Sequence, residues 1–186
     1  MALVKRSRGG VQPVALTRSD VIEEGLRIVQ REGLDALTIT TVARDLGVSS
    51  PAVYYYVSGK DDLIDRVCEL AAGQISLPPD EGAEWDDRIV AIILEMNDTF
   101  ARYPGVAARV LPFQRPSRAV DRVADEVRHC IEHGGFTGRD ADDLHAALHF
   151  LVGGWLLGKR PTVSEGAMTP ALLERSVRWL LAGASA

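Results

Sequence analysis

The chain has 186 residues, of which 46% are hydrophobic and 25% are charged, and its formal net charge is −5. That hydrophobic share can fill the core of one domain or two small ones, which excludes an intrinsically disordered chain. The sequence has no apolar run of about 18 residues, the length of a membrane-spanning helix, and no long apolar segment follows the basic N-terminus. We therefore expect a globular, cytoplasmic protein.

The charge is unevenly distributed along the chain. Residues 1–60 hold eight Lys and Arg against six Asp and Glu, a net charge of +2, whereas residues 61–186 hold thirteen against twenty, a net charge of −7. The acidic total argues against a general nucleic-acid binder, but a small positive part on an acidic body is typical of a DNA-contacting head.

The first segment, residues 1–16, contains three basic side chains, a Gly pair and a proline. This composition predicts a flexible basic arm. Such an arm either reaches a minor groove or phosphates of DNA, or is a plain solvated terminus. Thr17 is then expected to cap a first helix that runs to about Glu32 and ends at Gly33.

The stretch from Thr38 to Lys60 has the pattern of two short helices joined at a sharp angle. Apolar residues recur at helical spacing up to Leu46, and Gly47 supplies the left-handed position that ends the first of these helices. On the second, Val53 and Val57 are four residues apart and are expected to point inward. The side chains then expected to point outward are Ser50, Ala52, Tyr54, Tyr55 and Tyr56.

Beyond Lys60 the pattern remains helical, and we see neither a strand pattern nor an internal repeat. A connecting helix is expected over residues 61–77, and the prolines and glycine near residues 78–83 mark a boundary before a second helical layer, residues 84–186. The helices predicted in that layer run from Trp85 to Tyr103, from Pro116 to about His133, from about Arg139 to Gly158, and onward from Thr169 and Pro170.

The residues TITTVARDLGVSSPAVYYYVSGKDDL, preceded by a helix that ends in EGLDAL, resemble the DNA-binding signature of the TetR family of bacterial transcriptional repressors. The resemblance covers about residues 17–77. It implies a homodimeric all-α protein with a three-helix DNA-binding head, residues 17–60, that presents a helix-turn-helix to the major groove. It also implies a larger antiparallel helical domain, residues 84–186, for ligand binding and dimerisation.

The resemblance also places DNA contacts on this chain. Thr40 matches a position that reaches a base edge, Lys60 matches one that grips phosphate, and the second helix of the motif meets bases and phosphates. Tyrosine hydroxyls can donate to phosphate oxygens, whereas the short Thr40, Ser50 and Ala52 read bases weakly, so the operator sequence is not implied. The candidate DNA contacts are Thr40, Arg44, Ser49, Ser50, Pro51, Ala52, Tyr54, Tyr55, Tyr56 and Lys60.

Two of these candidates have a structural alternative. Arg44 either contacts a phosphate or is merely solvated. Tyr55 is the tyrosine that we expect to pack on the core of the head.

Large apolar and sulfur-containing side chains of the second layer are candidates for an effector cavity, although each is also explained as ordinary core. They are Trp85, Met96, Phe100, Tyr103, Phe113, Cys130 and Phe150. Small residues at helical spacing near the end of the chain favour close helix packing, either in a four-helix dimer interface, which we favour, or inside one subunit. The candidate interface residues are Ala147, Gly154, Gly158, Val177 and Leu181.

The four histidines form two pairs spaced i, i+4, His129 with His133 and His145 with His149. Two facing pairs can hold a metal, but the same residues equally line a pocket or an interface, and we predict neither a metal nor another cofactor. No catalytic motif is present, so an enzyme is not expected.

We therefore predict a repressor that a small effector releases from a palindromic operator, with the helix from Lys60 to about Ile75 as the moving lever. The alternative is a metal-sensing or small-molecule-binding helical module with little specific DNA binding.

Overall fold

The computed structural model describes residues 16–79, 82–112, 117–158 and 168–185. All regular secondary structure in these ranges is helical, which confirms the predicted all-α class. Most of the predicted arm, together with Phe113 and Pro116, lies outside the described residues. The elements are α1 (Arg18–Glu32), the 3-10 turn η1 (Leu34–Ala36), α2 (Ile39–Leu46), α3 (Ser50–Val53), α4 (Lys60–Ala72), α5 (Trp85–Arg102), α6 (Val106–Val110), α7 (Arg118–His133), α8 (Gly138–Leu157) and α9 (Pro170–Ala184).

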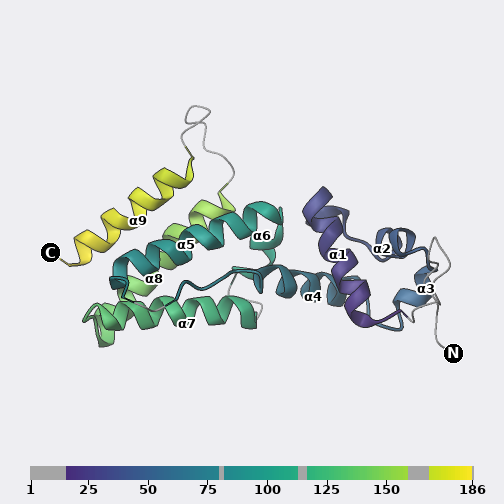
Figure 1. Cartoon of the computed structure of the whole chain (residues 1–186), viewed down its shortest axis with the longest axis horizontal. Coiled ribbons are helices and arrows are strands. Elements are labelled where there is room, and N and C mark those ends of the chain that lie inside the picture. Colours follow the sequence, from purple (N-terminus) through teal and green to yellow (C-terminus); the bar gives the residue numbers. More distant parts are fainter. Residues whose placement is uncertain (1–15, 80–81, 113–116, 159–167, 186) are drawn as a thin grey trace.

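The molecule is elongated, with α1 to α3 at one end and α5 to α9 at the other (Figure 1). Helix α4 runs from the first group toward the second and contacts members of both. It ends at Ala72, a few residues before the predicted end. None of the described helices is long and apolar enough to cross a membrane.

The small group, which we call the head, is built from capped helices. Thr17 begins α1, where its side chain accepts a hydrogen bond from the Asp20 amide and the Asp20 carboxylate accepts one from the Thr17 amide. Gly47 ends α2 with φ 68° and ψ 33°, the predicted left-handed conformation that costs glycine little. Val53 and Val57 are both buried, as predicted.

Helices α1 and α4 approach each other closely at Gly25 in the middle of α1. A β-carbon at this position would lie 2.6 Å from Val67 Cγ2 and 3.3 Å from Leu37 Cδ1, and both neighbours are fully buried. The absence of a side chain at Gly25 therefore sets the distance between the two helices.

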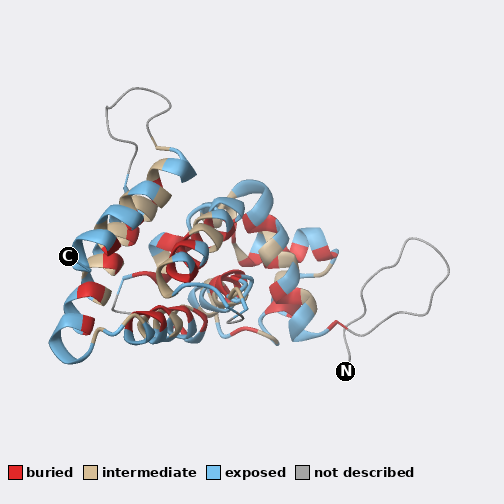
Figure 2. Ribbon diagram, turned by 60° about the vertical axis from the view of Figure 1, so that its left-hand side comes forward, coloured by how far each residue is buried: buried red, intermediate tan, exposed pale blue. Residues whose placement is uncertain are grey.

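The larger group, which we call the body, packs α5 against α7, α8 and α9. On α5, Ile89, Ile92, Met96 and Phe100 are buried, and Figure 2 shows buried residues on the inward faces of these helices with exposed residues outside. Helix α7 begins at Arg118 with Ser117 as its cap, two residues after the predicted start at Pro116. The buried thiols also behave as core, since burial raises the pKa of Cys68 to about 12.

Head and body also touch away from α4. The Leu34 amide donates to the Pro104 carbonyl over 2.9 Å. Gly105 has φ 91°, and a β-carbon there would lie 2.8 Å from Leu34 Cβ. From the sequence, we expected the connecting helix to be the whole link between head and body. This second contact was not predicted, because it joins segments about seventy residues apart.

Candidate nucleic-acid interface and cavities

The candidate DNA contacts lie on the outer surface of α2, α3 and the following turn. Helix α3 makes a single turn and ends at Val53, so the three tyrosines occupy a turn and not the predicted longer helix. Tyr54 and Tyr55 are exposed. The other exposed candidates are Thr40, Arg44, Ser49, Pro51 and Lys60, whereas Ser50 is half-buried.

Two sequence-based orientations are wrong. Ala52 is only 2% exposed, because a one-turn helix packed on α2 buries both Ala52 and its neighbour Val53. Tyr55, expected to pack on the core of the head, is 78% exposed. Tyr56 packs instead, and its hydroxyl donates to the Leu16 carbonyl over 2.7 Å. The helix ends before the tyrosines, so helical phase does not predict their directions.

The sequence analysis missed one basic residue of this surface. Arg18, at the start of α1, donates from Nε to the Tyr56 carbonyl over 3.1 Å. The contact spans 38 residues of sequence, and no local pattern signals it. Arg18 thereby stands beside the exposed tyrosines.

Other charges near the surface are partly neutralised within the head. The Asp45 carboxylate accepts from Arg44 and from Arg31, each over 2.9 Å, and the hydrogen bond from Arg44 is the main cause that lowers the pKa of Asp45. Because both arginines are solvated, these pairs contribute little to stability. Lys60, the first residue of α4, is exposed and positioned to meet an anion.

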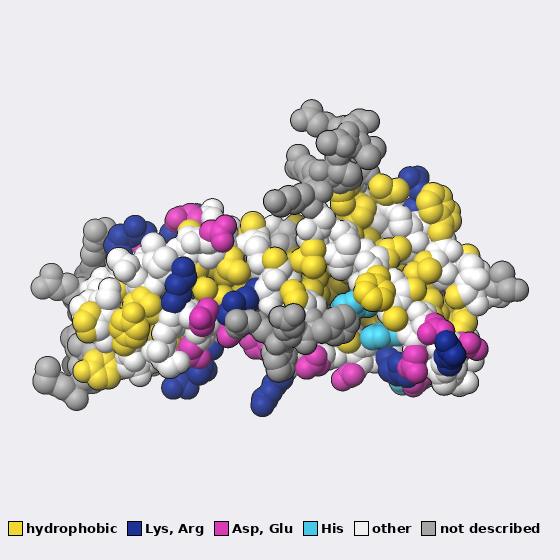
Figure 3. Space-filling view, turned by 180° about the vertical axis from the view of Figure 1, so that it is seen from behind, with side chains coloured by type: hydrophobic (Ala, Val, Ile, Leu, Met, Phe, Trp, Pro, Cys, Tyr) yellow, Lys and Arg dark blue, Asp and Glu magenta, His cyan; other side chains and the backbone are white. Residues whose placement is uncertain are grey.

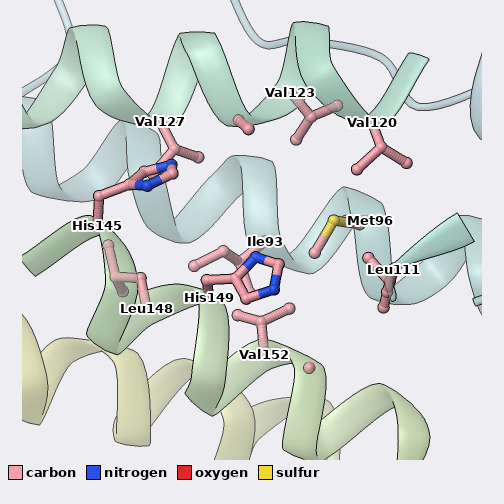
Figure 4. Close-up of a pocket in the computed structure, with 12 residues that line it drawn as sticks. Ile93, Met96, Leu111, Val120, Val123, Val127, His145, Leu148, His149 and Val152 are labelled. Carbon is pink, nitrogen blue, oxygen red and sulfur yellow. The ribbon is translucent and has the colours of Figure 1, made fainter. Parts of the chain in front are cut away.

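The body contains an apolar cavity between α5, α7 and α8, with a volume of about 60 Å³. Its two histidines, His145 and His149, point from α8 into the space faced by the valines of α7 (Figure 4). Burial first, and then the charge of His145, lowers the pKa of His149. The cavity is lined by Ile93, Met96, Leu111, Val120, Val123, Ala124, Val127, His145, Leu148, His149, Val152 and Gly153.

The structure does not bring the predicted ligand residues together. Of the six that the structure describes, which excludes Phe113, only Met96 lines this cavity. Trp85 and Cys130 border a second hollow of about 200 Å³, and Phe100 borders a third of about 360 Å³. Phe150 is 71% exposed, because it lies on the opposite side of α8 from the core-facing residues. Tyr103 is buried, but it does not line any of these three hollows.

We favour the smallest of these three hollows as the candidate effector cavity, since three long helices border it and every lining side chain except the two imidazoles is apolar. The second hollow includes Arg88, which already forms an ion pair with Glu126 over 2.6 Å. The third lies at the ends of α5 and α8 beside α6.

The two histidine pairs do not face each other. His129 and His133 contact each other on α7, with ring centroids 4.5 Å apart, and His133 borders the second hollow. Within the described ranges, no group of three or more His, Cys, Asp and Glu side chains could hold a metal ion.

Helix α4 is held to the body at two places that the sequence did not reveal. Near its start, Arg109 of α6 lies 2.7 Å from Asp65 and 3.3 Å from Asp61. Near its end, the Glu69 carboxylate accepts from Ser117 Oγ over 2.8 Å and from the Ala119 amide over 2.9 Å. Glu69 therefore places a negative charge at the N-terminus of α7, where the helix dipole favours it.

The outer face of α8 and α9 carries exposed apolar residues. Phe150 is 71% exposed and Trp179 66%, and a β-carbon on Gly154 would have no atom within 4 Å. Figure 3 shows hydrophobic side chains gathered on this side of the body.

Two predicted interface residues are wrong, since Val177 and Leu181 are buried within the subunit where α9 packs on α5 and α8. Of the others, Ala147 is half-buried and Gly158 caps α8.

Comparisons with known proteins agree with this architecture. The family model described as bacterial regulatory proteins, tetR family, matches residues 21–67. The chain is 28% identical over 141 residues to an HTH-type transcriptional regulator of Saccharopolyspora erythraea, covering 74% of this chain and 59% of that protein. It is 28% identical over 171 residues to the class D tetracycline repressor protein of Escherichia coli, covering 86% and 78%.

A solved structure shares the fold. BioQ of Mycobacterium smegmatis, in its crystal structure with its double-stranded DNA operator, superimposes with a TM-score of 0.71 at 18% identity, over 91% of this chain and 98% of that one. The superposition thus covers almost all of the BioQ chain, whereas the chain spans about three fifths of the length of the Saccharopolyspora regulator.

Proposed function

The chain belongs to the TetR family of bacterial regulatory proteins, and from that premise we propose that it is a homodimeric transcriptional repressor released from a palindromic operator by a small effector. The observation that carries the proposal is the pairing of an exposed helix-turn-helix surface with a cavity whose wall, α7, is bonded to α4. The BioQ structure with its operator supports the DNA-binding part of the proposal, and the name of the tetracycline repressor supports the part on a small effector. We assign the protein no catalytic role, and expect it to act in the cytoplasm, where the DNA is.

The head would meet DNA through the surface around Tyr54 and Tyr55. Their hydroxyls can donate to phosphates, while Lys60 and Arg18 add positive charge. Thr40 and Ser50 remain candidates for base contacts, whereas Ala52 supports α3 from inside. Short side chains at these positions leave much of the specificity to DNA shape.

The test of the function is binding of the full-length protein to DNA flanking its own coding region, measured by fluorescence anisotropy at several salt concentrations. We expect tight binding that unlabelled DNA of random sequence does not compete away. A weak isotherm that is the same for every sequence would favour the helical binding module instead.

Lys60 is the sharpest probe of the DNA surface. Changing Lys60→Ala should weaken binding to operator and random DNA alike and reduce the slope of log affinity against log salt by about 1, because one phosphate contact is lost. The matched control is Arg139→Ala, a fully solvated cation at the start of α8 in the body. Equal losses in the two variants would mean that overall charge, and not this surface, governs binding.

The effector signal would pass through α4. Val120, Val123 and Val127 of α7 line the cavity, and the first turn of the same helix bonds to Glu69 of α4. Arg122 extends this link by donating to the Ile75 carbonyl over 2.7 Å. An effector that displaces α7 would therefore displace α4, which packs on α1 in the head.

Glu69 tests this link. Changing Glu69→Ala should lower the free energy of unfolding by about 1–2 kcal/mol, because α7 loses an acceptor and a favourable charge at its N-terminus. Hydrogen exchange at the Ala119 amide should accelerate in the alanine variant. In Glu69→Gln, which keeps an acceptor oxygen, the exchange rate and the stability should lie between those of the wild type and of Glu69→Ala. Unchanged exchange at Ala119 in the alanine variant would contradict the link.

A further inference from the structure

The cavity between α5, α7 and α8 has apolar walls, and both of its polar side chains come from one helix. Its walls are apolar side chains from three helices and Leu111, and the polar groups among its lining residues are two imidazoles on one helix. His145 and His149 are spaced i, i+4 and both point inward (Figure 4). Among the described residues, no acidic side chain lines the cavity.

We propose that this cavity selects compact organic acids, with the carboxylate held by His145 and His149 and the apolar body against Ile93, Met96 and the valines of α7. The inference rests on the proposed function, since it names the chemical class of the effector. An imidazole can donate a hydrogen bond to a carboxylate, and a protonated imidazole adds charge attraction that roughly doubles the strength of that bond. An amine would meet no negative partner among these side chains.

The protonation state of His149 is expected to change when an anion enters the cavity. Burial and the charge of His145 keep His149 neutral near pH 7, because they lower its pKa. Among the described residues that line the cavity, those of α5 and α7 and Leu111 are apolar, and His145 is the other titratable group. A bound carboxylate would favour the protonated imidazole of His149 and raise its pKa, so binding takes up protons.

The size of the cavity limits the acid and explains its effect. The cavity, of about 60 Å³, is smaller than the roughly 150 Å³ that holds benzene in a protein core, and it is partly open to solvent, so a single-ring acid would press on the walls while its outer part stays in solvent. Helix α7 forms one of those walls and bonds to Glu69 of α4. Binding would thus perturb the link to the head.

The test is isothermal titration calorimetry of the full-length protein with phenylacetate and hexanoate, each paired with its neutral amide. We expect each acid to bind about tenfold or more tightly than its amide, because the charge-assisted bond is lost in the amide. Acid affinity should fall by up to about tenfold per pH unit above neutrality for each proton taken up. The heat of binding should change with the ionisation heat of the buffer.

Two variants locate the site. His149→Gln, which keeps a donor of similar size but cannot be charged, should weaken acid binding and reduce proton uptake. The control His129→Gln, on the exposed face of α7 and outside this cavity, should change neither. Amides that bind as tightly as acids, equal behaviour of the two variants, or no acid binding at millimolar concentration would each overturn the inference.

Operator release is measured separately. Acid binding without release from operator DNA would leave the ligand class standing and contradict the effector role. Release by a neutral molecule that competes for the same cavity would support the proposed function and overturn the ligand class.

Discussion

Replacing Gly25 with alanine is expected to lower the free energy of unfolding by about 1–3 kcal/mol, the range for overpacking a well-filled core. In an exposed helix the same change stabilises by about 1 kcal/mol, because glycine is the poorer helix former. Here the new methyl would lie 2.6 Å from Val67 Cγ2, and Val67 is fully buried between α1 and α4. The steric cost should exceed the gain in helix propensity, and α1 must shift away from α4.

The measurement is urea unfolding followed by circular dichroism at a fixed protein concentration, since dimerisation makes stability concentration-dependent. The control is Gly183→Ala in the last turn of α9, where a β-carbon meets no atom within 4 Å and a gain of up to about 1 kcal/mol is expected. Adding Val67→Ala to Gly25→Ala should restore part of the loss by making room. A Gly25→Ala protein as stable as wild type would refute the close approach of α1 and α4.

Gly25 also shows what the sequence can and cannot predict about the fold. Local signals gave the helices, because Thr17 and Gly47 act within one turn of chain through caps and a left-handed position. Gly25 carries no such signal, since a glycine inside a helix is explained only by its neighbour across the helix pair. The contacts of Leu34 with Pro104 and of Glu69 with α7 were unpredictable for the same reason.

The candidate sites differ in the same way. Most of the candidate DNA surface lies in one contiguous stretch, so its resemblance to a family motif indicated it, and the expectations failed where α3 ends early, at Ala52 and Tyr55, and at the distant Arg18. The candidate effector cavity is assembled from three distant helices, and the described ligand candidates chosen from the sequence are dispersed among three hollows, the core and the surface. The small residues Val120 and Val127, with two histidines, form it instead.

The outer face of α8 and α9 carries the proposed dimer interface. Phe150, Gly154 and Leu157 recur at i, i+4 and i+7 and therefore share one side of α8, and Trp179 is exposed on α9. Exposed large apolar residues around a glycine that admits close approach are typical of helix-to-helix association between subunits. Because Val177 and Leu181 already hold α9 within the subunit, this face is free for a second copy.

Changing Phe150→Glu should convert the dimer into a monomer of 20.2 kDa, because a carboxylate would be buried in an apolar contact without a partner. Operator affinity should fall by about a hundredfold or more, since the two heads no longer bind as one linked unit. The subunit itself should stay folded, because Phe150 is 71% exposed and contributes little to the core. Light scattering after size exclusion gives the mass, and circular dichroism reports the fold.

The control is His129→Glu, which adds the same charge to the exposed face of α7. If both variants stay dimeric, the interface lies elsewhere on the molecule. If Phe150→Glu is monomeric yet binds operator as tightly as wild type, then the paired heads are not the source of affinity. A dimer built on α8 and α9 requires that Phe150→Glu lower both the molecular mass and the operator affinity, while the control variant changes neither. Both change together because each subunit supplies only one head for two half-sites.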